Sequence, residues 1–171
     1  MSLLRYVTPD AMFERVEDVR LSLLEEWNIR GIALDLDNTI VPWHTSALTP
    51  MVRAWVAGLH AAAIRMCLLT NNYSRQAADV AAELRMPIVR NAFKPLPAGF
   101  RRSLEHLGVP PGAALCIGDQ LFTDVLGAKV TGMRAILVRP VSNREFPTTK
   151  VLRALERPVL ARLRRSESAD A

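Results

Sequence analysis

The chain has 171 residues, of which 50% are hydrophobic and 23% are charged, so we expect residues 1–171 to form a single globular domain with a full core. Its eight glycines and eleven prolines follow no repeat, which excludes collagen-like and low-complexity chains. The formal net charge of +5 favours phosphate-bearing partners such as anionic lipid, nucleic acid or a phosphorylated small molecule.

No apolar run reaches the roughly 18 residues that a membrane-spanning helix needs, and the N-terminus lacks the apolar core of a signal peptide. Cys67 and Cys116 each lie within an apolar segment. We interpret them as small buried hydrophobes rather than as a disulfide or a metal site. Together these features predict a cytoplasmic protein.

Short apolar runs alternate with helical patterns along the chain, which is typical of a parallel sheet with helices on both faces. The first 30 residues form a leader, in which Ala11–Glu26 is expected to form helical turns. A core of residues 31–140 follows, with five predicted strands: Gly31–Leu36, Arg65–Leu69, Pro87–Val89, Ala114–Ile117 and Ala135–Val138. The predicted fold class is therefore α/β and Rossmann-like.

Helix signals fill the gaps between these strands. The predicted helices are one capped by Thr49, one capped by Ser74, one from Pro97 to Gly108, and a short one over residues 123–130. After the last strand, basic and apolar residues interleave in an amphipathic segment, residues 141–171.

Polar side chains follow four successive strands at the point where each strand ends. They are Asp35 and Asp37, then Thr70 and Asn71, then Lys94, and finally Asp119 and Asp124. Ligands of open α/β sheets bind beyond the carboxyl ends of the strands, so we expect these side chains at one edge. Crowded carboxylates repel one another unless a cation lies among them, and ligands that are all oxygen suit Mg²⁺. The predicted metal ligands are Asp35, Asp37, Asp119 and Asp124.

These groups fit the transfer of a phosphoryl group. Asp35 is placed to attack phosphorus and form an aspartyl-phosphate, and Asp37 to act as general acid and then general base. Thr70 and Asn71 offer hydrogen-bond donors to the phosphoryl oxygens. Lys94 offers a positive charge that neutralises both the nucleophile and the phosphoryl group.

The same residues resemble the four motifs of the haloacid dehalogenase superfamily of phosphohydrolases. The motifs appear as "DLDNT" at residues 35–39, Thr70 of "LLTNN", Lys94, and "GDQLFTD" at residues 118–124. Dehalogenases of the superfamily lack the acid/base aspartate that Asp37 supplies, so the resemblance implies a phosphatase.

A finer resemblance is carried by "GIALDLDNTIVPW", "FKP" and "NREFPTTKVLRALERP". These stretches resemble the YqeG-type group of subfamily IIIA, which is similar to the mitochondrial phosphatidylglycerophosphate phosphatases. The resemblance implies an enzyme that uses Mg²⁺ to convert phosphatidylglycerophosphate to phosphatidylglycerol.

Short spacings between the motifs leave room for one helix each, and so predict that the fold has no large cap domain. An open site suits a phosphate that is attached to something large or embedded in a bilayer. The basic residues 141–171 could then hold the protein peripherally at the inner face of an anionic membrane, but such a segment can also contact nucleic acid or form a solvated face packed against its own domain, and the sequence leaves these alternatives open.

Other interpretations stay open. Asn38 and Thr39 are expected to shape the turn, with Thr39 orienting Asp37, rather than to bind substrate. The substrate could instead be a soluble sugar phosphate, a nucleotide or a nucleic-acid end. A non-enzymatic module that binds RNA, the ribosome or a membrane is a further alternative, which the intact motifs disfavour. The sequence leaves the oligomeric state open.

Overall fold

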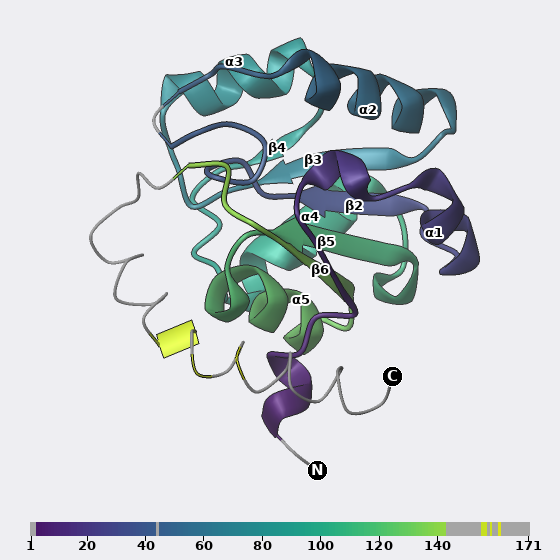
Figure 1. Cartoon of the computed structure of the whole chain (residues 1–171), viewed down its shortest axis with the longest axis vertical. Coiled ribbons are helices and arrows are strands. Elements are labelled where there is room, and N and C mark those ends of the chain that lie inside the picture. Colours follow the sequence, from purple (N-terminus) through teal and green to yellow (C-terminus); the bar gives the residue numbers. More distant parts are fainter. Residues whose placement is uncertain (1–2, 44, 143–154, 157, 159–160, 162–171) are drawn as a thin grey trace.

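The structure, a computed structural model, describes residues 3–43, 45–142, 155–156, 158 and 161. Its centre is a six-stranded parallel sheet in the order β1-β6-β5-β2-β3-β4 (Figure 1). The strands are β1 (Ala11–Phe13), β2 (Gly31–Leu34), β3 (Arg65–Leu69), β4 (Ile88–Val89), β5 (Ala114–Gly118) and β6 (Arg134–Val138). The last five coincide with the predicted strands to within about two residues, so the prediction of a parallel α/β sheet is confirmed.

Five α-helices connect the strands: α1 (Leu21–Glu26), α2 (Pro50–Ala61), α3 (Arg75–Glu83), α4 (Pro97–Leu107) and α5 (Leu126–Val130). Two predicted caps are confirmed. The Thr49 hydroxyl accepts a hydrogen bond from the Val52 amide at 3.1 Å, and the Ser74 hydroxyl accepts one from the Ala77 amide at 3.3 Å. Gly108 ends α4 in the left-handed conformation, with φ 59°, as its position after the helix predicts.

The expectation of helical turns over Ala11–Glu26 is wrong at its start, because the first three residues form β1. This strand pairs in parallel with β6, with Ala11 opposite Ile136. The Asp10 carboxylate anchors the strand by accepting a hydrogen bond from the Ala135 amide at 2.7 Å. The sheet therefore has six strands instead of about five, and within Ala11–Glu26 the helical turns are α1 and the 3-10 turn Val16–Asp18.

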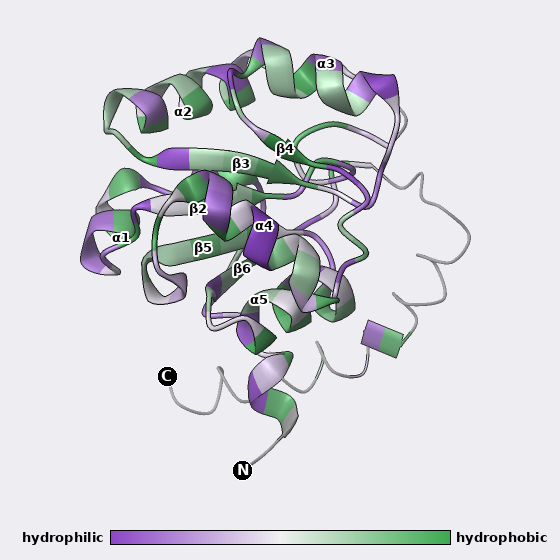
Figure 2. Ribbon diagram, turned by 180° about the vertical axis from the view of Figure 1, so that it is seen from behind, coloured by the Kyte–Doolittle hydropathy of each residue, from purple (hydrophilic) through white to green (hydrophobic). Residues whose placement is uncertain are grey.

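Each face of the sheet has its own core. Ile32 and Leu34 of β2 pack with residues of α1, α2 and α3, whereas Ala33 packs on the other face with residues of α4 and α5. Figure 2 shows the strands coloured hydrophobic over most of their length, as expected for strands that are covered on both sides. None of the helices in the described part of the chain has both the length and the apolar character that a bilayer crossing requires.

The connections at the carboxyl edge are short. Only α2 lies between β2 and β3, and only α3 lies between β3 and β4. Apart from residue 44, these connections are fully described, and they contain no inserted cap domain. In the described residues, neither of these two connections therefore adds a domain over the edge of the sheet that carries the predicted site.

Both cysteines are buried, unpaired side chains in the core beneath α4 and α5, as predicted. Burial raises the pKa of the Cys67 thiol to about 12 and holds the pKa of the Cys116 thiol well above its usual range. We expect neither thiol to react with iodoacetamide in the folded protein at about pH 8. Mass spectrometry after labelling should find both cysteines modified only when the protein is unfolded in guanidinium, and rapid labelling of the folded chain would contradict the buried placement.

These thiols also predict how stability depends on pH. An unfolded thiol ionises near pH 9, whereas the folded Cys67 thiol stays neutral until about pH 12. The contribution of the neutral, buried Cys67 thiol to the free energy of unfolding is therefore complete below pH 9. It is lost as the pH rises from 9 toward 12, because the unfolded chain can ionise the thiol and the folded chain cannot. The double variant Cys67→Ala/Cys116→Ala should lower stability at neutral pH but flatten this alkaline loss, as measured by urea unfolding at several pH values.

Candidate active site

The first predicted site residue, Asp35, lies directly after β2, where its amide donates a hydrogen bond to the Ile117 carbonyl at 2.9 Å. Its carboxylate is buried, with 4% of the residue exposed. Lys94 Nζ donates to Oδ1 at 2.5 Å, and the Thr39 hydroxyl donates to Oδ2 at 2.9 Å. Thr39 therefore orients Asp35, and the expectation that it orients Asp37 is wrong.

Lys94 is the positive centre of the site. Its Nζ also donates to Asp124 Oδ1 at 2.6 Å, so one ammonium group joins two buried carboxylates. Burial lowers the pKa of Lys94, but the charges of Asp124 and Asp35 raise it by more, and the side chain stays protonated. For Asp35, burial is the largest effect and raises the pKa to about 7, although Lys94 opposes the rise.

The loop after β5 supplies two more carboxylates. Asp119 follows the last residue of β5, and Asp124 lies on a turn of π-helix, Leu121–Val125. Both are buried, with 2% and 1% exposed. Asp124 Oδ2 accepts hydrogen bonds from the Gln120 amide at 3.2 Å and from the Thr123 hydroxyl at 3.3 Å, which fixes the direction of its side chain.

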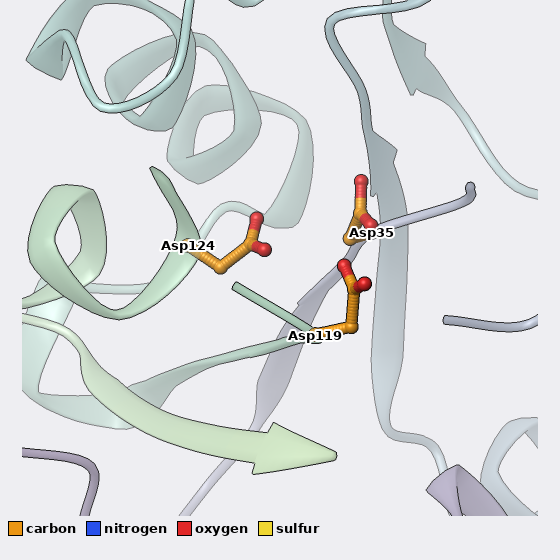
Figure 3. Close-up of side chains that lie close together, drawn as sticks. All are labelled: Asp35, Asp119 and Asp124. Carbon is orange, nitrogen blue, oxygen red and sulfur yellow. The ribbon is translucent and has the colours of Figure 1, made fainter. Parts of the chain in front are cut away.

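Figure 3 shows the side chains of Asp35, after β2, Asp119, after β5, and Asp124, on the π-helical turn, lying close together. One carboxylate oxygen from each lies within 4.8 Å of the others. Three carboxylates face one ammonium group, so a bound divalent cation would balance the charge that Lys94 leaves. The donor set is all oxygen and buried, and it fits Mg²⁺.

Asp37, the fourth predicted metal ligand, is not one of these three grouped carboxylates, but its charge contributes to the raised pKa of Asp35, and Asp37 is only partly buried. Its Oδ2 accepts hydrogen bonds from Asn72 Nδ2 at 3.1 Å and from the Thr70 hydroxyl at 3.4 Å. Asn72 is not among the predicted site residues, although it stands beside Asn71 in "LLTNN". The two aspartates after β2 thus have different surroundings. Asp35 contacts the charged ammonium group of Lys94, whereas Asp37 contacts the uncharged side chains of Asn72 and Thr70.

Asn71 connects two loops of the site. Its Oδ1 accepts a hydrogen bond from the Lys94 amide at 2.7 Å, and its Nδ2 donates to the Lys94 carbonyl at 3.4 Å. The side chain thereby fixes the backbone of Lys94. Asn71 is thus an exposed residue whose amide group binds the Lys94 backbone, whereas Thr70, 1% exposed, donates its hydroxyl hydrogen to Asp37.

Gly118 leaves room for the Asp124 carboxylate, because a Cβ at this position would lie closer than 3.0 Å to that side chain. Asp124 cannot move aside freely, since Lys94 and the Gln120 amide hold it. We expect Gly118→Ala to lower stability by about 2 kcal/mol and to weaken Mg²⁺ binding, as measured by urea unfolding and metal titration. Gly112→Ala is the matched control, because nothing lies within 4 Å of its Cβ; equal effects of both changes would contradict the packing argument.

Most of the predicted basic segment, residues 141–171, lies outside the described residues. Within it, Glu156 is 2% exposed, and its Oε1 accepts a hydrogen bond from the Phe122 amide at 3.2 Å. This part of the segment therefore packs against the π-helical turn that carries Asp124. Its contact with a membrane stays a prediction.

Comparison with known proteins supports the fold and the chemistry. Residues 42–132 match the family of haloacid dehalogenase-like hydrolases. "Probable phosphatase YqeG" of Bacillus subtilis is 32% identical over 163 residues, which cover 95% of each chain. The "Phosphatidylglycerophosphate phosphatase 1, chloroplastic/mitochondrial" of Arabidopsis thaliana is 24% identical over 94% of this chain, but the match spans only 48% of that protein.

Two solved structures show the same fold. A 3-deoxy-D-manno-octulosonate 8-phosphate phosphatase from Yersinia pestis has a TM-score of 0.53 at 17% identity, covering 69% of each chain. An uncharacterized protein from Listeria monocytogenes has a TM-score of 0.55 at 16% identity, covering 70% of this chain and 85% of that one. The family match and the Bacillus subtilis relative, a probable phosphatase matched over 95% of its length, confirm the sequence resemblance: this chain belongs to the haloacid dehalogenase-like hydrolases.

Proposed function

We propose that the protein hydrolyses a phosphomonoester through an aspartyl-phosphate on Asp35. The observation that carries the proposal is the buried Asp35 carboxylate, joined by Lys94 to Asp124 and lying beside Asp119. Burial raises the pKa of Asp35 to about 7, and the Lys94 ammonium opposes this rise and so favours the ionised carboxylate that a nucleophile needs. Similarity to phosphatases over 95% of the chain supports the same reaction.

In the first step, one oxygen of Asp35 attacks phosphorus while the bond from phosphorus to the leaving oxygen breaks. Asp37 protonates that oxygen, and Thr70 donates a hydrogen bond to the phosphoryl group. In the second step, a water molecule attacks the phosphorus of the aspartyl-phosphate and Asp37 takes its proton, while the bond from phosphorus to the Asp35 oxygen breaks and releases inorganic phosphate and the free carboxylate. A hydrogen bond from Asn72 keeps the Asp37 carboxylate at this position while the Thr70 hydroxyl turns from Asp37 to the phosphoryl oxygen.

Asp35, Asp119 and Asp124 would hold Mg²⁺, with Asp37 adjoining the site. When bound, the ion supplies positive charge that offsets the carboxylates and orients the phosphate. Lys94 supplies a second positive charge to the same site, because its ammonium group donates hydrogen bonds to both Asp35 and Asp124.

The proposed substrate is phosphatidylglycerophosphate, acted on at the inner face of a membrane. Two observations support a large, lipid-linked substrate: the similarity to the plant phosphatidylglycerophosphate phosphatase and the absence of a cap domain in the described connections after β2 and β3. The net charge of +5 favours approach to an anionic lipid surface.

The test is phosphate release from phosphatidylglycerophosphate in mixed micelles, measured with and without Mg²⁺, beside a panel of soluble phosphomonoesters. Asp35→Asn provides the blank. Lipid turnover that needs Mg²⁺ and vanishes in the variant is the expected result. Activity confined to soluble esters would discard the lipid substrate, and no activity on any ester, with salt-sensitive RNA binding instead, would discard the enzyme.

A further inference from the structure

One turn beside the catalytic lysine sends side chains in opposite directions. The Leu96 amide donates a hydrogen bond to the Phe93 carbonyl at 2.9 Å, which closes a turn around Lys94. Lys94 points inward and is 8% exposed, whereas Phe93 is 67% exposed and Leu96 is 59% exposed. Two large apolar side chains in the turn that holds Lys94 are therefore mostly exposed to solvent.

The backbone of Phe93 has a φ of 51°, a conformation that bulky residues adopt rarely. Because its ring is mostly exposed, Phe93 contributes little to the core. Core packing therefore does not account for an aromatic residue at this strained position. An outward-facing contact does account for it.

The neighbouring loop adds a third exposed side chain, Tyr73, which is 76% exposed. The two loops are joined by the hydrogen bonds between Asn71 and the Lys94 backbone, and by one from the Ala92 amide to the Thr70 carbonyl at 3.1 Å. Tyr73, Phe93 and Leu96 therefore lie on adjoining loops at the same edge of the sheet, and we call them the apolar rim.

Positive charge accompanies the apolar rim. Arg90 Nη1 donates to the Tyr73 carbonyl at 3.5 Å, and Arg102 Nη2 donates to the Asn91 carbonyl at 3.1 Å. Both arginines line a pocket of about 400 Å³ with Tyr73 and His106. Of the described residues that line this pocket, none is acidic.

We infer that the apolar rim, with Arg90 and Arg102 beside it, is the surface on which the protein rests against an anionic lipid bilayer. Aromatic and aliphatic tips enter the boundary between headgroups and acyl chains, while arginines meet the lipid phosphates. The positive charge of these arginines matches an anionic bilayer and favours it over an uncharged apolar partner. The inference rests on the proposed lipid-linked substrate, because the rim would bring Asp35 to the depth of the headgroups.

The variant Phe93→Asn/Leu96→Ser removes two tips of the apolar rim with little risk to folding. Asn tolerates a positive φ, and Leu96 is the N-cap of α4, where Ser is favoured. In sedimentation with vesicles of phosphatidylglycerol and phosphatidylcholine, we expect the affinity of the full-length variant to fall at least tenfold. Turnover of the soluble ester p-nitrophenyl phosphate should stay within about twofold of the wild type. Val130→Ser, at an exposed position that leads into the opposite edge of the sheet, is the matched control and should bind as the wild type does.

A second measurement reads the contact itself. In Phe93→Trp, lipids with brominated acyl chains should quench the added tryptophan, whereas in Val130→Trp they should leave it unquenched. Equal quenching at the two positions, or unchanged vesicle affinity of the double variant, would overturn the inference. So would loss of a dimer in the double variant without loss of vesicle binding, because the rim would then be an interface between copies of this chain.

The outcomes separate this inference from the proposed function. Rim-dependent vesicle binding without hydrolysis of phosphatidylglycerophosphate would support the bilayer surface and discard the lipid substrate. Hydrolysis of the lipid in micelles, with no vesicle binding by the wild type, would support the substrate and overturn the surface.

Discussion

Asp35→Asn is expected to lower phosphatase turnover by at least roughly 10³-fold while the fold is kept. The amide has nearly the shape of the carboxylate but cannot attack phosphorus. Its single oxygen can still accept the hydrogen bond from Lys94, whereas its amide nitrogen would replace the oxygen that accepts from Thr39 and would donate to the Thr39 hydroxyl instead. Steady-state phosphate release under saturating Mg²⁺, beside circular dichroism of the folded protein, measures both parts of the prediction.

The matched control for this variant is Asp79→Asn, because Asp79 is an exposed aspartate on α3. It removes the same charge and should leave turnover within about twofold of the wild type. Turnover by Asp35→Asn at a tenth of the wild-type rate or more would rule out Asp35 as the nucleophile.

Lys94→Met is expected to be the most damaging change to stability in the site. The ammonium group is buried between Asp35 and Asp124, so its removal leaves two buried carboxylates without their shared cation. Breaking such a buried pair from one side costs about 3 kcal/mol or more. Turnover should fall by roughly 10²-fold or more, because the charge on the phosphoryl group loses its protein cation.

Urea unfolding without divalent cations measures this loss, and Lys129→Met is the control. Lys129 Nζ pairs with Asp10 Oδ2 at 2.7 Å near the surface, where loss of an ion pair costs less than about 1 kcal/mol. If Lys94→Met were as stable as Lys129→Met, the ammonium would not be compensating the buried carboxylates.

Much of the fold could be predicted because the signals are local. β2, β3 and β5 are continuous apolar runs, and Thr49 and Ser74 are capping residues in sequence and in space. β1 could not be predicted in this way. It has three half-buried residues, and it is fixed by pairing with β6, more than 120 residues away along the chain.

In the candidate site, too, the sequence predicted which residues meet but not how their individual atoms are paired. The rule that polar residues gather at the carboxyl ends of parallel strands predicted that Asp35, Lys94, Asp119 and Asp124 meet, and the structure brings them together. The partners of individual atoms depend on the turn itself. Asn38 has a φ of 61°, and the turn it forms directs Thr39 to Asp35, which spacing alone did not indicate.

Exposure was the least predictable property of the site. Phe93 would be expected in a core from its chemistry, yet it is 67% exposed. Its direction follows from the turn that buries Lys94, so only the three-dimensional structure separates a core aromatic from a surface one at this position.

The most direct test of the central claim is to trap the intermediate. The protein would be mixed with radiolabelled phosphomonoester and Mg²⁺ for less than one turnover, quenched in acid, digested and mapped. We predict label on the peptide that contains Asp35, released by hydroxylamine as expected for an acyl phosphate, and absent from Asp35→Asn. Phosphate release at the normal rate with no label on that peptide would contradict the account, because water would then attack the substrate directly.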